Sequence, residues 1–308
     1  MVGGFGRVWS NPARTWLYGV SYARMVLCMT VFISPQELYE RIKSGKKQTV
    51  LDVSWEPEAG KAWQKFQSEH IPTAVYGDLE GHLVGMPGRR QGRNPLPSLT
   101  VIDEALEEWG VEAERPVFIY DQGSGVFAAR AWWIMRWAGL EHVHIIDGGF
   151  REWEAEGFKT IAGPGNVVVP RDLELEGSKL PVATLEDVQQ FEGVLIDARD
   201  EKRFAGRREV LDLKAGHIPS ALNLPAADLF CKETRKIKET DYIRDRFASL
   251  GVTQNTDPAN MITYSGSGNH SALLIAAMEH AGLPVATHYV SGWSQWSARL
   301  GNKVATAL

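Results

Sequence analysis

The two halves of the chain repeat one pattern of short motifs, and this repeat limits the possible folds more than any other feature of the sequence. Each half contains, in the same order, an apolar strand ending in Asp, a His-Ile-Pro turn, an apolar strand ending in Tyr and a Gly-Ser-Gly loop. These motifs begin at Val50, His70, Val117 and Gly123 in the first half, and at Val194, His217, Met261 and Gly266 in the second. Such a repeat is typical of two domains that share one fold.

Each half alternates short apolar strands with helical patterns, as at residues 34–44 and 185–192. This alternation indicates βα units and predicts an α/β fold, in which each domain is a mostly parallel sheet with helices on both faces. Residues 161–181 carry a Gly-Pro-Gly sequence and Pro170, which favours a linker. The predicted organisation is an extension over 1–28, a first domain over 29–160, a linker over 161–181 and a second domain over 182–308.

Composition narrows the classes of function. With 308 residues the chain is long enough for two domains, and its formal net charge of -5 gives no basis for nucleic-acid binding. Its two cysteines, Cys28 and Cys231, form no CxxC pair, which argues against a cysteine-built metal site and fits a reducing cytoplasm. No apolar run is long enough to span a bilayer. Residues 1–28 contain three arginines and no acidic residue, a faint transit-peptide pattern, and are predicted to be a disordered extension.

The second Gly-Ser-Gly loop follows an apolar strand and opens an apolar helix, with Ser265 at the junction. A serine in such a place is ordinarily a turn or capping residue. A strand that leads into a glycine loop at a helix start also turns several backbone N–H groups toward one point, which stabilises an anion. Ligands of open α/β folds bind at this edge of the sheet. The sequence therefore predicts a small-anion site centred on Ser265. The binding candidates in this loop are Gly266, Gly268, Asn269 and His270.

The duplicated pattern resembles the tandem-domain rhodanese and 3-mercaptopyruvate sulfurtransferase family from about residue 30 to the C-terminus. The resemblance is carried by residues 52–55, 92–97, 131–133, 147–153, 197–199, 203–204 and 216–219. Family members of the 3-mercaptopyruvate type carry a Cys-Gly-Ser-Gly loop, and residues 265–268 match it with serine in place of the catalytic cysteine. When the two Gly-Ser-Gly loops are aligned, Gln122 is the first-half counterpart of Ser265.

The resemblance implies transfer of a sulfane sulfur from an anionic donor, 3-mercaptopyruvate or thiosulfate, to a thiol or cyanide acceptor through a cysteine persulfide. A serine hydroxyl stays protonated near neutral pH and forms no persulfide. The chain as written is therefore expected to be inactive. Either the cysteine was deliberately replaced, which the otherwise intact loop favours, or the chemistry was lost. The alternative is a non-catalytic protein that binds small anions at the same loop.

The resemblance also implies an arginine that holds the donor. Arg203 matches the family's first donor-binding arginine, and a guanidinium suits a carboxylate or thiosulfate, although a surface arginine is the simpler interpretation. The family's second arginine has no residue in register here, and Arg207 or Arg208 are the possible substitutes. Arg93 lies in a Gly/Pro-rich loop of the first domain. This loop is ordinarily solvated, but it is also able to fold over the second domain's site and attract anions.

His70 and Ser267 match a pair of residues proposed in the family as a proton relay. The histidine has an equally good architectural interpretation, because His217 repeats the same His-Ile-Pro turn. Asn269 and His270 replace the family's usual Val-Thr and put polar groups on the first helical turn. His270 either adds positive charge beside the loop or caps the helix.

A weaker alternative of another class lies in the first half. Residues 123–128 follow a strand and read Gly-Ser-Gly-Val-Phe-Ala, the relaxed G-x-G-x-x-A pattern of a dinucleotide site, with Asp147 at a suitable distance. The main interpretation implies no metal and no organic cofactor. Its predicted partners are the small sulfur donor and the acceptor, without nucleic acid or membrane, in a cytoplasmic monomer or weak dimer.

Overall fold

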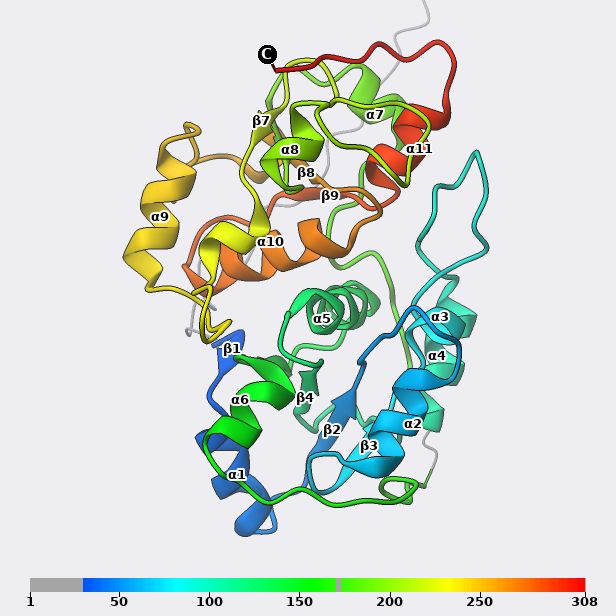
Figure 1. Ribbon diagram of the computed structural model, residues 1–308, viewed down its shortest axis with the longest axis vertical. Coiled ribbons are helices and arrows are strands. Elements are labelled where there is room, and N and C mark those ends of the chain that lie inside the picture. The colour runs from blue at the N-terminus through cyan, green and yellow to red at the C-terminus, as the bar shows by residue number, and fades with distance from the viewer. Residues whose placement is uncertain (1–29, 170–172, 308) are drawn as a thin grey trace, which may run out of the picture.

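A computed structural model describes residues 30–169 and 173–307, which form two α/β domains stacked end to end (Figure 1). The predicted extension over 1–28 lies outside the described residues. The helices and strands named below all fall within 29–160 or 182–308, while the limits proposed for the domains stay a prediction.

The first domain is built on a five-stranded sheet. Its strands are β1 (Phe32–Ile33), β2 (Thr49–Asp52), β3 (Ala74–Tyr76), β4 (Val117–Tyr120) and β5 (Val143–Ile146). Their order is β1-β5-β4-β2-β3, and every neighbouring pair is parallel. Its helices are α1 (Pro35–Lys43), α2 (Lys61–Ser68), α3 (Leu79–His82), α4 (Leu99–Glu108), α5 (Val126–Ala138) and α6 (Gly149–Ala155).

Helices cover both faces of this sheet because successive strand residues point to opposite sides. Val50 and Phe118 face a cluster that includes side chains of α1, α2 and α6. Their neighbours Leu51 and Ile119 face the cluster that includes α4 and α5. Strands buried on both faces read as the continuous apolar runs seen in the sequence.

The second domain repeats this plan. Its strands are β6 (Val194–Asp197), β7 (Leu222–Asn223), β8 (Met261–Tyr264) and β9 (Thr287–Tyr289). Its helices are α7 (Leu185–Gln189), α8 (Glu201–Phe204), α9 (Thr240–Ala248), α10 (Asn269–His280) and α11 (Gly292–Ala298), with 3-10 turns η2 (Ala226–Leu229) and η3 (Pro258–Asn260). The strand order β7-β6-β8-β9 matches β3-β2-β4-β5, and all pairs are parallel. The predicted fold class is therefore confirmed.

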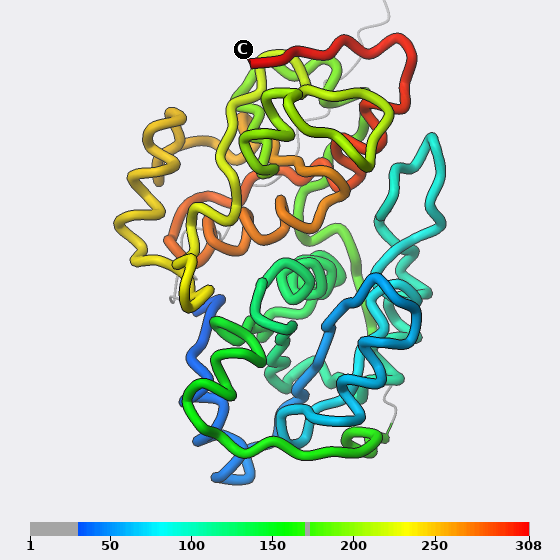
Figure 2. The backbone as a smooth tube through the Cα atoms, in the orientation of Figure 1, coloured from blue at the N-terminus to red at the C-terminus, as the bar shows by residue number. Residues whose placement is uncertain are grey.

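Helices α5 and α10 lie side by side between the two sheets and join the domains (Figures 1 and 2). Most residues of both helices are buried, including Ala128 to Met135 and Ser271 to Met278. A helix that is apolar on all sides is one packed on all sides. One continuous hydrophobic cluster consequently runs from Leu51 of the first sheet to Met261 of the second.

Candidate functional site

The loop at residues 265–268 is held tightly where β8 meets α10. Ser265 is 0% exposed, and its Oγ accepts a hydrogen bond from the Gly268 N–H at 3.1 Å. Its carbonyl accepts the N–H of Trp293 at 2.8 Å, which ties the loop to α11. Gly268 has a φ of +91° and Gly292 passes so close that a Cβ there would lie 2.2 Å from the Ser265 carbonyl oxygen. The predicted loop residues are thus brought together by a fixed backbone.

Backbone N–H groups gather around this loop. Across the described ranges 30–169 and 173–307, no protein acceptor is hydrogen bonded to the N–H of four residues: Gly266, Ser267, Asn269 and His270. Unpaired N–H groups at the start of a twelve-residue helix carry partial positive charge and attract anions.

The equivalent loop of the first domain shows what such a ring of donors holds. Asp121 follows β4 as Ser265 follows β8, and its carbonyl accepts the Phe150 N–H at 2.9 Å, as Ser265 does from Trp293. The Asp121 carboxylate accepts hydrogen bonds from the N–H groups of Gly123, Gly125 and Phe127 at 2.8, 2.9 and 3.0 Å. The first copy fills its own ring of donors with a negative charge.

This geometry corrects two predictions about the first domain. Asp121, and not Gln122, occupies the place of Ser265, because the first loop has one residue more before its Gly-Ser-Gly; Gln122 instead donates to Ser54 Oγ. The dinucleotide alternative at residues 123–128 is also wrong. The donors that would hold a pyrophosphate already bind the Asp121 carboxylate, which would repel one.

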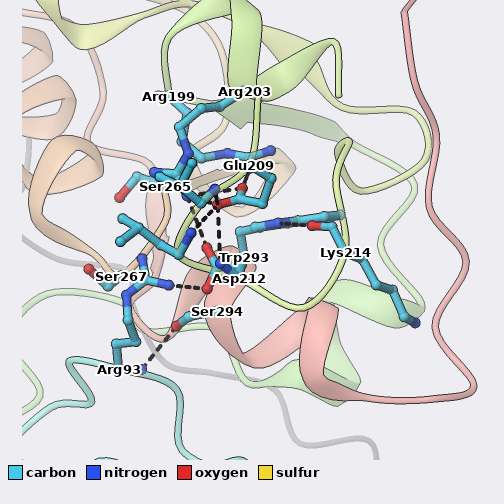
Figure 3. Close-up of polar contacts among 12 residues, drawn as sticks. Arg93, Arg199, Arg203, Glu209, Asp212, Lys214, Ser265, Ser267, Trp293 and Ser294 are labelled. Carbon is cyan, nitrogen blue, oxygen red and sulfur yellow. Dashed lines mark hydrogen bonds and ion pairs between the residues drawn. The ribbon is translucent and has the colours of Figure 1, made fainter. Parts of the chain in front are cut away.

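Two arginines from different domains lie over the second-domain loop. A Cβ placed on Gly266 would lie 3.0 Å from Nη2 of Arg93 and 3.3 Å from Nη1 of Arg203. Arg203 extends from α8, and Arg93 comes from the first-domain loop that reaches across to this site (Figure 3). The structure therefore brings both predicted arginines to the loop.

Two carboxylates that sequence reasoning missed pair with these arginines. Nη2 of Arg203 lies 3.0 Å from Glu209 Oε1 and 3.0 Å from Asp212 Oδ2, and Arg93 bonds to the same Asp212 (Figure 3). Burial raises the pKa of Asp212, against the charge of the two arginines. Burial opposes ionisation of Glu209 too, but the N–H of Leu211 and the charge of Arg203 outweigh it and lower its pKa. A sequence signal for these carboxylates exists, because Glu209 and Asp212 lie in the same stretch, 207–212, as the candidate arginines Arg207 and Arg208.

The first domain also contributes a direct contact to the loop. Asn94 Nδ2 donates to Ser267 Oγ at 3.2 Å, and the Arg93 N–H donates to Ser294 Oγ at 3.0 Å. The first-domain loop that contains Arg93 and Asn94 is therefore hydrogen bonded to the second domain.

His70 makes no hydrogen bond to Ser267 in the described residues, and its predicted role in a proton relay stays a prediction. His70 is 0% exposed, stacks on Phe66 and places Nδ1 2.7 Å from the Phe66 carbonyl oxygen. His217 makes the same stack and hydrogen bond with Phe204 in the second domain. These equivalent contacts favour the architectural interpretation of both histidines.

The remaining predicted residues lie at the rim. Arg207 and Arg208 are exposed, and within the described residues only their backbone N–H groups are hydrogen bonded, to the Lys202 carbonyl. Neither reaches the loop as a substitute for the family's second arginine. Asn269 keeps a buried Oδ1 without a partner. Although His270 retains exposed surface, the protein around its ring, and then the charge of Arg203, lower its pKa.

A buried ion pair between Arg199 and Asp197 lies next to the helix that holds the loop. Arg199 grips the Asp197 carboxylate with Nε at 3.0 Å and Nη2 at 2.6 Å, and Nη2 also donates to the Gly216 carbonyl at 2.7 Å. The guanidinium lies 4.7 Å from the ring centre of Trp293 in α11. Arg199 therefore links the end of β6 to the helix that fixes the loop.

No group of three or more His, Cys, Asp or Glu side chains in the described ranges could hold a metal ion. None of the helices formed by those residues is long and apolar enough to cross a membrane.

Comparisons with known proteins give one family. The rhodanese-like domain family matches the chain twice, at residues 34–156 and 182–299. The chain is 34% identical over 250 residues to a Pseudomonas aeruginosa protein named "Probable 3-mercaptopyruvate sulfurtransferase", covering 78% of this chain and 86% of the relative. It is 31% identical over 282 residues to a Mycobacterium tuberculosis protein named "Putative thiosulfate sulfurtransferase SseB", covering 87% and 94%.

The solved structures agree with this assignment. The crystal structure of the 3-mercaptopyruvate sulfurtransferase SseA from Escherichia coli superimposes with a TM-score of 0.73 at 27% identity, over 86% of this chain and 99% of that one. The 3-mercaptopyruvate sulfurtransferase of Leishmania major has the same fold, with a TM-score of 0.78 at 23% identity over 87% and 74%. With two matched domains and relatives that are named as sulfurtransferases, the chain belongs to the tandem-domain rhodanese family.

Proposed function

We propose that the loop at residues 265–270 binds the anionic end of a small sulfur donor, 3-mercaptopyruvate or thiosulfate, and that Ser265 stands at the position of the family's catalytic cysteine. The observation that carries this proposal is the pair of equivalent loops. The first holds the Asp121 carboxylate on three N–H groups, and the second has four N–H groups without a protein acceptor beneath Arg93 and Arg203. A guanidinium pair over such donors suits a carboxylate or a sulfur oxyanion.

The residue at position 265 decides whether binding leads to turnover. With cysteine there, a thiolate stabilised by the loop would take the sulfur as a persulfide and pass it to a thiol or cyanide. With serine, the hydroxyl remains protonated and the donor is bound without reaction. We therefore propose that the chain as it stands is an inactive member of a sulfurtransferase family that retains anion binding. Its cytoplasmic location and its state as a monomer or weak dimer stay predictions.

A variant that copies the first domain tests the binding site. Ser265→Asp places a carboxylate in the second loop at the position that Asp121 occupies in the first. There it would accept hydrogen bonds from the loop N–H groups and repel a second anion. Calorimetric titration with thiosulfate should show binding to the unchanged protein and to Ser265→Ala, and at least about a tenfold loss in Ser265→Asp. Equal binding by the aspartate variant, or none by the unchanged protein, would overturn the proposal.

Asp212 is expected to weaken anion binding, because it bonds to both arginines over the loop. Asp212→Asn keeps a hydrogen-bond acceptor but removes the competing charge. We expect thiosulfate to bind about tenfold more tightly, which corresponds to about 1.4 kcal/mol. Titration at two salt concentrations should show the gain shrinking as salt screens the arginines. The control is Asp245→Asn, which removes the same charge from an exposed position on α9. An equal effect of both variants would contradict a local role for Asp212.

A further inference from the structure

A chain of buried polar side chains begins at Ser265. Ser271 Oγ, in the first turn of α10, lies 3.2 Å from Ser265 Oγ. His288 Nε2, on β9, lies 2.7 Å from Ser271 Oγ. All three residues are 0% exposed.

The first domain shows that the fold does not require these polar groups. Gly125 and Gly268 cap α5 and α10 in the same left-handed conformation, so Ser271 corresponds to Ala128. Strand pairing makes His288 the counterpart of Ile145, since His288 pairs with Thr263 as Ile145 pairs with Ile119.

The apolar pair in the first domain is as deeply buried as the polar pair in the second. Ala128 and Ile145 are each 1% exposed. Burying a hydroxyl and an imidazole in place of two apolar groups costs free energy unless their hydrogen bonds are made. In the second domain this polar pair contacts the loop serine, Ser265, through Ser271, which points to a role at that serine.

The direction of the hydrogen bonds follows from the one atom that lacks a partner. Burial and the nearby charge of Arg130 hold the pKa of His288 well below its usual value, so the ring is neutral and carries one N–H. Its Nδ1 is buried without a hydrogen-bond partner. A proton on Nδ1 would be an unpaired buried donor, whereas a proton on Nε2 is accepted by Ser271 Oγ. His288 therefore donates, and Ser271 cannot donate to it.

The hydroxyl proton of Ser271 then has two acceptors within reach. One is the Gly268 carbonyl at 3.1 Å, which already accepts the Ala272 N–H, and the other is Ser265 Oγ. With Ser271 donating to it, Ser265 Oγ accepts two hydrogen bonds, the second from the Gly268 N–H at 3.1 Å. A hydroxyl oxygen has two lone pairs, so its own hydrogen is left to point elsewhere.

We propose that Ser271 and His288 are positioning residues, which make the atom at position 265 an acceptor of two hydrogen bonds and so direct the Ser265 hydroxyl proton at a bound anion. This inference rests on the proposed anion site and adds the residues that orient its central group. The two donors to position 265, the Ser271 hydroxyl and the Gly268 N–H, would also stabilise a thiolate there, because hydrogen bonds to the charged form of a group favour that form.

The first measurement uses the unchanged protein. Nitrogen-15 NMR of the histidine rings should show His288 as the neutral tautomer with its proton on Nε2 throughout the pH range in which the protein is folded. A proton on Nδ1, or a charged ring at pH 7, would overturn the proposal, because Ser271 would then face a different partner.

The second measurement reads the effect at position 265 without requiring sulfur transfer. In a Ser265→Cys background with the other two cysteines replaced by serine, the pH dependence of the ultraviolet absorbance of the thiolate gives the thiol pKa without any reagent having to reach the buried position. Ser271→Ala with His288→Ile, the residues of the first domain, should raise this pKa by about one unit, while Ser271→Thr should leave it near the parent value. Arg93, Arg130 and Arg203, which face the loop, are the same in all variants.

Either outcome of this titration is informative. An unchanged thiol pKa in the folded Ala/Ile variant, with circular dichroism matching the parent, would refute the role of the pair. Because the absorbance titration needs no sulfur donor, failure of the proposed function would leave this result readable. Conversely, if the thiol pKa does not rise in the Ala/Ile variant, the proposed anion site is still tested separately by the thiosulfate titration.

Discussion

Replacing Ser265 with cysteine is expected to raise sulfur transfer at least about 10³-fold, which is the scale of effect seen when an enzyme's nucleophile is removed. The fixed loop and the two arginines are already in place, so the substitution supplies the one atom that the chemistry needs. A thiolate in this ring of donors would attack the sulfur that the donor transfers and keep it as a persulfide, while sulfite leaves from thiosulfate or pyruvate leaves, as its enolate, from 3-mercaptopyruvate. Thiocyanate formation from cyanide, measured with 3-mercaptopyruvate and with thiosulfate, gives the rate, and mass spectrometry gives the added sulfur.

The controls separate this effect from other thiols. Cys231 retains some exposure, so the experiment is repeated with Cys231→Ser in both backgrounds. Ser265→Ala should remain inactive. Turnover by the unchanged protein at the rate of the cysteine variant would refute the role given to position 265, and inactivity of that variant with both donors would remove the sulfurtransferase proposal.

Arg199→Met is expected to lower the free energy of unfolding by about 3–5 kcal/mol, because it leaves the Asp197 carboxylate buried without its partner. The methionine fills much of the space over Trp293 but donates no hydrogen bond to the Gly216 carbonyl. Urea unfolding at pH 7, followed by tryptophan fluorescence, measures the loss.

Two further variants locate the cause of that loss. Arg199→Met combined with Asp197→Asn removes both charges and should recover a large part of the stability, since the unpaired buried charge is the main cost. Arg208→Met deletes an exposed arginine and should change the free energy of unfolding by less than about 0.5 kcal/mol. A loss of under 1 kcal/mol in Arg199→Met would show that solvent reaches Asp197.

The repeat, the parallel sheets and the place of the loop could be predicted from sequence, because each rests on short-range patterns. Apolar runs bounded by Asp or Tyr fix the strands, and glycines that need a left-handed φ fix the loops. The equivalence of the two loops could not be settled in this way. Aligning glycines selects Gln122, while aligning strand ends selects Asp121, and only the shared hydrogen bond to the following aromatic helix decides between them.

The site itself was predicted in part, and its missing members share one cause. Arg203 and Arg93 were found as candidates, but Asn94 and Asp212 gain their roles from contacts that span 173 and 119 residues of sequence. Short-range sequence patterns do not predict contacts between residues so far apart in the chain. The His-Ile-Pro motif of His70 is strong in sequence, but the printed contacts of its ring are with Phe66 of the same turn and not with the loop.

The packing of α5 against α10 has a consequence for how the molecule responds to ligands. Since one hydrophobic cluster contains side chains of both domains, unfolding either domain would strip the other of part of its interior. We therefore expect the two halves to melt as a single cooperative unit. An anion bound at the second-domain loop stabilises only the folded form, so by mass action it would also protect the first domain from heat and proteolysis, although most of that domain never touches it.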